Sequence, residues 1–175
     1  MSVARGTTEK AEREEHDTDF KAPEHDSLEA LVAAHPFFLG ISEHHVELLA
    51  DCAMKIRFQA GRTVFREGES ANRFYLIEQG EIALESAARQ AEAVVIDTVR
   101  SGDLLGWSWL FPPYVWHFGA RTVLPTSAIF FYGTILREYC EKDHTLGYEL
   151  FRRMSEVMTR RLQSAHTRLL ASYSK

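Results

Sequence analysis

Glycines divide the middle of the chain into short, strand-like segments, and this punctuation constrains the fold more than any other feature of the sequence. The segments are rich in β-branched and aromatic residues, and glycines stand at positions 61, 68, 80, 102 and 106. Short strands separated by regular turn residues are typical of an all-β roll or barrel. Two further strands are predicted at 121–124 and 127–132. We therefore expect a compact β-roll in this part of the chain.

Helical periodicity flanks the predicted roll on both sides. Ser27 precedes the segment LEALVAA and Ser42 precedes EHHVELLADCA, and serine is a preferred N-terminal cap of helices. After the strands, Thr145 begins a long predicted helix whose apolar residues recur every three or four positions. The main members of this apolar stripe are Leu150, Met154, Met158 and Leu162.

Charge divides the chain into three parts, which its net charge of −5 conceals. Residues 1–27 carry four basic and eight acidic side chains, whereas residues 150–175 carry six basic and one acidic. The first 26 residues hold too few apolar side chains to offset the entropy cost of ordering, so we expect a flexible tail, either without a role or folding onto a partner. The sequence thus predicts a flexible charged tail (1–26), a helical lead-in with a β-roll sensor domain (27–143) and a long amphipathic C-terminal helix (144–175).

Several classes of function find no support in the sequence. The chain has no apolar run of the roughly 18 residues that a membrane span needs, and no apolar leader at its N-terminus. Its two cysteines, Cys52 and Cys140, lack the spacing of a disulfide framework or a zinc site. Catalytic motifs such as a nucleophile elbow, a P-loop or HExxH are missing. We expect a cytoplasmic protein that is not an enzyme and that binds no metal.

A specific pattern connects these elements to a known family. Phe65, Glu67, Gly68, Ala71, Phe74, Tyr75, Ile77 and Gly80, followed by Gly102, Asp103 and Gly106, read F-x-E-G-x-x-A-x-x-F-Y-x-I-x-x-G…G-D-x-x-G. This pattern resembles the cyclic-nucleotide-binding domain of Crp/Fnr-class regulators, of gated channels and of kinases, over residues 30–172. The resemblance implies a mainly β fold with flanking helices, a double-stranded β-helix (jelly roll) followed by a long C-terminal helix.

In that family a short cassette after the G-D turn binds the ligand. The resemblance implies that backbone amides after a glycine hold the cyclic phosphate, that a glutamate accepts the ribose 2′-hydroxyl and that an arginine pairs with the phosphate. In this chain Gly106 matches the glycine, Trp107 stands at the glutamate position, and Phe118 or His117 stands at the arginine position. An indole cannot accept a ribose hydroxyl and a phenyl ring cannot neutralise a phosphate, so ordinary cAMP or cGMP is disfavoured. Arg121 follows three or four residues late, and a rearranged loop would be needed to bring it to a phosphate.

Aromatic residues take the place of the usual ligand-binding groups. The six within 12 residues are Trp107, Trp109, Phe111, Tyr114, Trp116 and Phe118. They pack the vacated pocket, line a pocket for a flat or apolar ligand, or form a docking surface for another protein. The candidate ligand-pocket residues are Gly106, Trp107, Ser108, Trp109, His117, Phe118 and Arg121. Haem ligation by His117 is not favoured, because a lone histidine among aromatics is more often a hydrogen-bonded core residue.

The C-terminal helix is the candidate relay. In Crp-like proteins the corresponding helix forms a dimer axis, so the resemblance implies that Leu150, Met154, Met158 and Leu162 contact a second copy or a partner, and we expect a homodimer. The alternative is that this stripe packs on its own roll. We interpret the chain as a non-catalytic sensor module that binds a small effector and relays it through this helix to a partner, without binding nucleic acid by itself. The alternative is a ligand-free subunit that uses the same fold for protein interaction or assembly.

Overall fold

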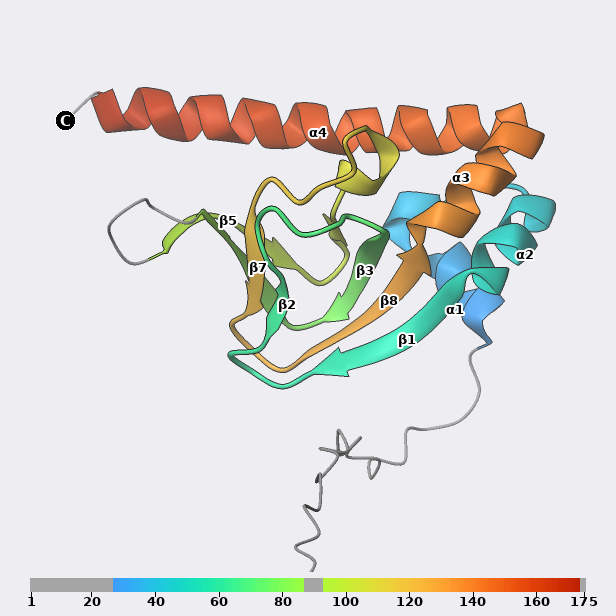
Figure 1. Cartoon of the computed structure of the whole chain (residues 1–175), viewed down its shortest axis with the longest axis horizontal. Coiled ribbons are helices and arrows are strands. Elements are labelled where there is room, and N and C mark those ends of the chain that lie inside the picture. Colours follow the sequence, from blue (N-terminus) through green and yellow to red (C-terminus); the bar gives the residue numbers. More distant parts are fainter. Residues whose placement is uncertain (1–26, 87–92, 174–175) are drawn as a thin grey trace, which may run out of the picture.

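The structure is a computed structural model that describes residues 27–86 and 93–173. In this part of the chain eight antiparallel strands form two four-stranded sheets that face each other as a roll, and a long C-terminal helix runs along one side (Figure 1). The predicted jelly roll with flanking helices and a long C-terminal helix is therefore confirmed. The predicted flexible tail, 1–26, lies outside the described residues.

The strand orders are β1-β8-β3-β6 in one sheet and β2-β7-β4-β5 in the other. The strands span Ala53–Phe58 (β1), Thr63–Phe65 (β2), Arg73–Gln79 (β3), Glu81–Ser86 (β4), Val94–Arg100 (β5), Leu104–Leu105 (β6), Gly119–Thr122 (β7) and Thr126–Tyr132 (β8). The two-residue strand β6 was not predicted, because it is too short to give a periodic pattern.

The helices are α1 (Leu28–Ala34), α2 (Glu43–Asp51), α3 (Gly133–Lys142) and α4 (His144–Tyr173), with 3₁₀ turns η1 (Pro36–Phe38) and η2 (Ser108–Leu110). The predicted caps of α1 and α2 are confirmed, since Ser27 Oγ and Ser42 Oγ accept backbone hydrogen bonds in the first turns. At α4 the capping residue is Asp143, whose Oδ1 accepts the amides of Thr145 and Leu146 at 2.9 and 3.1 Å.

Two hydrophobic cores lie on opposite faces of the same strands. Along β3, Phe74 and Leu76 point into a core shared with the helices, whereas Tyr75 and Ile77 point between the two sheets. Successive side chains of a strand alternate between its faces, so β3 and β8 are buried on both sides. We call these the helix-side core and the roll interior.

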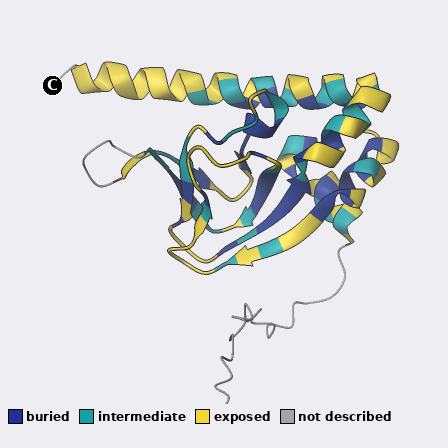
Figure 2. Ribbon diagram, in the orientation of Figure 1, coloured by how far each residue is buried: buried dark blue, intermediate teal, exposed yellow. Residues whose placement is uncertain are grey.

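Helix α4 belongs to the helix-side core in its first half only. Its buried residues are Leu146, Leu150, Met154 and Val157. Beyond Val157 every residue is half-buried or exposed, and Figure 2 shows the ribbon changing from buried to exposed towards the C-terminus. The second half therefore lies beside the roll without completing its core.

Candidate functional site

The segment after β6 forms one wall of the site that the sequence predicts. Gly106 has a φ of +91°, and a Cβ atom there would lie 2.9 Å from the Trp116 ring. The turn therefore needs glycine for two reasons: an L side chain rarely adopts this backbone conformation, and the indole occupies the space. In this chain Gly106 makes room for a tryptophan.

Trp116 fills the roll interior at this position. Its ring stacks on Phe65 with 3.8 Å between centroids and 10° between planes, and 5% of the residue is exposed. The backbone is fixed as well, because Trp116 accepts a hydrogen bond from the Gly68 amide and donates one to the Glu69 carbonyl at 2.8 and 2.9 Å. The indole is thus held on both its ring and its main chain.

The cavity that remains beside Trp116 has a volume of about 20 Å³. Such a space holds about one water molecule, whereas small-molecule pockets commonly measure ~300–1,000 Å³. Five of the predicted pocket residues do line it together: Gly106, Trp107, Ser108, His117 and Phe118. They surround a nearly filled space.

Two of the predicted pocket residues lie elsewhere. Trp109 is fully buried in the helix-side core, where it stacks on Phe74 with 5.4 Å between centroids. Arg121 lies on the outer face of β7, between the buried residues Ala120 and Thr122, and its Nε donates to Glu85 Oε1 at 3.0 Å. The structure therefore does not bring Arg121 to the cavity, because strand alternation turns it outwards.

His117 shows no sign of a ligand role towards the cavity. Its side chain is exposed, and Nδ1 lies 3.0 Å from the Val115 carbonyl oxygen. Among the residues that the structure describes, no three His, Cys, Asp or Glu side chains gather as a metal site. Burial raises the pKa of the Cys52 thiol to about 12, which keeps it protonated and unreactive.

The charged side chain that reaches the cavity comes from α4. Arg161 Nη2 donates to the carbonyl of Leu104, the first residue of β6, and the guanidinium carbon lies 5.4 Å from the centre of the Trp107 ring. Nη1 is buried and has no hydrogen-bond partner among the described residues. Burial lowers the pKa of this guanidinium. Arg161 is not among the predicted pocket residues. The sequence signal that could have identified it is its spacing, seven residues after Met154 and four after Val157, which places it on the buried stripe.

A second arginine, Arg168, attaches α4 to the roll two helical turns after Arg161. Arg168 Nη1 lies 3.3 Å from Asp97 Oδ1, and its Nη2 donates to the Ile96 carbonyl at 3.3 Å. Arg161 and Arg168 thus connect the second half of α4 to β5 and β6. We call Arg161 and Arg168 the arginine struts. They attach a part of α4 that has no core residue, since none lies beyond Val157.

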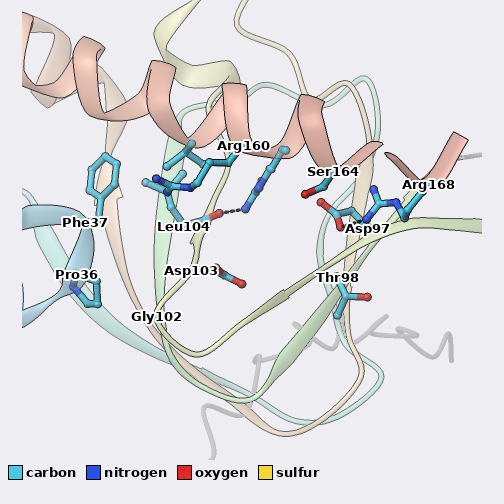
Figure 3. Close-up of a pocket in the computed structure, with 12 residues that line it drawn as sticks. Pro36, Phe37, Asp97, Thr98, Gly102, Asp103, Leu104, Arg160, Ser164 and Arg168 are labelled. Atoms are coloured by element: carbon cyan, nitrogen blue, oxygen red, sulfur yellow. Dashed lines mark hydrogen bonds and ion pairs between the residues drawn. The ribbon is translucent and has the colours of Figure 1, made fainter. Parts of the chain in front are cut away.

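A groove opens on each side of the strutted helix. The apolar groove, about 590 Å³, lies between α4 and the roll, and Trp107, Phe118, Ile96, Met158 and Leu162 line it. The polar groove, about 500 Å³, lies towards η1 and the turn before β6. Figure 3 shows this polar groove with Arg160 and Ser164 on the helix above Asp103 and Thr98.

The four residues of the predicted apolar stripe lie in two environments, the helix-side core and the apolar groove. Leu150 and Met154 are fully buried in the helix-side core, so they contact their own roll and are not open to a second copy. Met158 is half-buried and Leu162 is 57% exposed, and both line the apolar groove. No helix within residues 27–86 and 93–173 combines the length and apolar character needed to cross a membrane.

The known proteins that this chain resembles are of one kind. A family model described as "Cyclic nucleotide-binding domain" matches residues 55–143. A cAMP-dependent protein kinase regulatory subunit of Schizosaccharomyces pombe is 32% identical over 78 residues, which cover 45% of this chain and 18% of the relative. A CRP-like cAMP-activated global transcriptional regulator of Mycobacterium tuberculosis is 23% identical over 142 residues, covering 81% of this chain and 62% of the relative. The chain therefore spans less than two thirds of either protein.

Solved structures show the same architecture. The crystal structure of a cyclic nucleotide-binding domain from Methylobacillus flagellatus superposes with a TM-score of 0.70 and 18% sequence identity. The likeness covers 83% of this chain and 82% of that one. The roll and its helices are thus shared, while most of the side chains differ.

Proposed function

Because the chain belongs to the cyclic nucleotide-binding domain family, we propose that it is a regulatory, non-catalytic module whose effector binds outside the roll interior. The observation that carries this proposal is the stacked Trp116, which leaves about 20 Å³ where the family resemblance implies a ligand. Trp107 and Phe118 also stand where the ribose- and phosphate-binding side chains are expected. The mycobacterial relative is described as cAMP-activated. In this proposal the roll interior, which within the described residues has about 20 Å³ free beside Trp116, does not take that ligand.

The apolar groove is the site that we assign to the effector. It borders the filled cavity, since Leu84, Trp107, Phe118 and Arg161 line both. Its volume of about 590 Å³ suits a small molecule, and its two aromatic rings favour a flat or apolar one.

Helix α4 is the relay in this proposal. A ligand in the apolar groove would contact Met158 and Leu162 on the helix and Trp107 on the roll at once. The second half of α4 has no core residue of its own to resist movement. Differential contact with two positions of this helix is the condition for an effector to shift its equilibrium.

Ligand-induced thermal stabilisation tests this proposal. We expect cAMP and cGMP at millimolar concentration to leave the melting temperature unchanged, and an apolar aromatic probe such as 8-anilinonaphthalene-1-sulfonate to bind saturably. Met158→Glu should abolish probe binding, while Thr167→Glu, on the exposed part of α4 away from the groove, should preserve it. Saturable cAMP binding by the unaltered protein would refute a filled interior, and probe binding insensitive to Met158→Glu would refute the groove.

A specific observation favours assembly as a second candidate function. Leu162, Leu169, Leu170 and Tyr173, in the second half of α4, are between 54% and 81% exposed. Large apolar side chains gathered on one exposed helix end are typical of a contact with another protein or a second copy. Light scattering after size-exclusion chromatography, at low and high salt, tests homodimer formation. A dimer that Leu169→Glu converts to a monomer would support it, and a monomer under all conditions would contradict it.

A further inference from the structure

The polar groove beside α4 has the features of a second ligand site, and we propose that it binds a phosphorylated sugar or a similar polyhydroxylated phosphomonoester. The proposal does not depend on the assignment of the effector to the apolar groove, because it rests on Arg160 and Asp103, which line the polar groove and not the apolar one. The two grooves share Asp97 and the arginine struts, Arg161 and Arg168, in their linings.

The helix side of the polar groove carries one cation, Arg160, that has no acidic partner among the described residues. Arg160 is exposed and makes no hydrogen bond or ion pair within the described part of the chain. Arg161, next to it, also lines the groove, but its Nη1 is buried and has no hydrogen-bond partner there. The exposed guanidinium of Arg160 therefore offers the free donors, because it presents N–H groups in a planar fork that phosphate oxygens can satisfy.

The opposite side of the groove offers hydrogen-bond acceptors. Asp103 uses one carboxylate oxygen, Oδ2, to accept the Arg100 amide at 2.8 Å, which leaves the other oxygen free for a ligand donor. Asp97 is paired with Arg168, and Thr98 follows it on β5. Carboxylates facing a groove repel a bare anion but accept hydrogen bonds from hydroxyl groups.

Apolar atoms complete the binding surface at the end of the groove nearest η1. Pro36 and Phe37 lie there, apart from Asp97 and Arg168 at the other end, as Figure 3 shows. A partly buried aromatic ring beside acceptors and cations suits a sugar, whose carbon face is apolar and whose edge is polar. The volume of about 500 Å³ accommodates a molecule of this size.

The charges of the side chains that line the polar groove restrict the class of ligand further. Arg160, Arg161 and Arg168 face Asp97 and Asp103, so the groove carries a net charge of +1. Once the Arg168–Asp97 pair is set aside, two cations remain against one carboxylate. The complementary molecule bears a phosphate at one point and hydroxyl donors at another, which neither inorganic phosphate nor a neutral sugar supplies alone.

Calorimetric titration of the full chain with ribose 5-phosphate tests the proposal, with inorganic phosphate and ribose as separate arms. We expect saturable binding of ribose 5-phosphate, weaker binding of phosphate and none of ribose. Arg160→Gln should weaken ribose 5-phosphate binding by about ten- to hundredfold, the range for a charged hydrogen bond. Arg152→Gln, a matched change on the same helix outside the groove, should leave it unchanged.

The variant Asp103→Asn tests the contact with the ligand's hydroxyl groups separately from the contact with its phosphate. Asparagine retains an acceptor for the Arg100 amide, so the turn is kept, while the carboxylate is lost. We expect weaker binding of ribose 5-phosphate and unchanged or tighter binding of inorganic phosphate. The proposal is overturned if ribose 5-phosphate does not saturate, if phosphate alone binds equally well, or if Arg160→Gln has no effect while circular dichroism shows the fold intact. A failed test of the apolar groove would leave each of these outcomes unaffected.

Discussion

The two halves of α4 continue one apolar stripe but have different surroundings. Up to Val157 the helix has four buried side chains, three of which belong to the helix-side core, and beyond it the helix is connected to the roll by the two arginine struts. One continuous apolar stripe in the sequence therefore corresponds to two structural situations. The first half of the helix packs in the core, and the second half is attached to the roll by polar contacts. Apolar periodicity thus identifies the apolar face of a helix, but it does not show whether the chain's own core or something else covers that face.

The largest expected effect compares two leucines of this helix. Leu150→Ala should lower the free energy of unfolding by about 2–5 kcal/mol, because Leu150 is fully buried among core residues. Leu169→Ala, at a position 54% exposed, should change it by less than ~0.5 kcal/mol. Urea unfolding at several protein concentrations measures both and separates folding from association. Equal losses in the two variants would show that the second half of α4 is also core.

A smaller effect is expected from removing the struts. Arg161→Gln combined with Arg168→Gln should accelerate amide hydrogen exchange in residues 158–173 by about tenfold, since the loss of charged hydrogen bonds makes local opening easier. Exchange in residues 146–157 should stay as it is. Arg160→Gln provides the control, because Arg160 connects nothing within the described residues. Uniform acceleration along the whole helix would contradict a division at Val157.

The smallest effect concerns acid stability of the first half. Arg152 and Arg153 hold the pKa of Glu149 at about 2, below its value of ~4.3 in an unfolded chain. The stabilisation is therefore complete above the unfolded pKa and is lost as the pH falls from about 4.3 towards 2. Melting temperatures across this interval should decline less steeply in Glu149→Gln than in the unaltered protein. Parallel curves would indicate that this exposed network contributes nothing measurable.

The fold could be predicted because glycines, strand patterns and caps are local signals. Ser27 and Ser42 each act within three residues, and the short strands of the roll follow turn residues directly. The site was harder, because its contents depend on contacts between distant segments. The sequence predicts that Trp107, and Phe118 or His117, stand at the positions of the ligand-binding groups. The position of Trp116 in the interior depends on its stack on Phe65, which the sequence does not indicate.

Arg161 shows most clearly why part of the site escaped prediction. A stripe drawn through Met158 and Leu162 places Arg161 on the exposed flank, whereas the buried residues continue through Val157. Moving the stripe by one residue brings Arg161 towards the roll, where it meets the Leu104 carbonyl and the Trp107 ring. Both stripes fit helical periodicity, and only packing distinguishes them.

The contact between Gly106 and Trp116 sets a condition on redesigning this protein. Introducing an acidic residue at position 107 and an arginine at 118 would restore the polar groups of a nucleotide site without restoring its volume. The indole 2.9 Å from the position of a Gly106 Cβ would still occupy the hollow. Truncating Trp116 alone would open the volume without supplying any group to recognise a nucleotide. If the interior is filled as we propose, a nucleotide site would need at least three simultaneous substitutions, which a library of single substitutions does not contain.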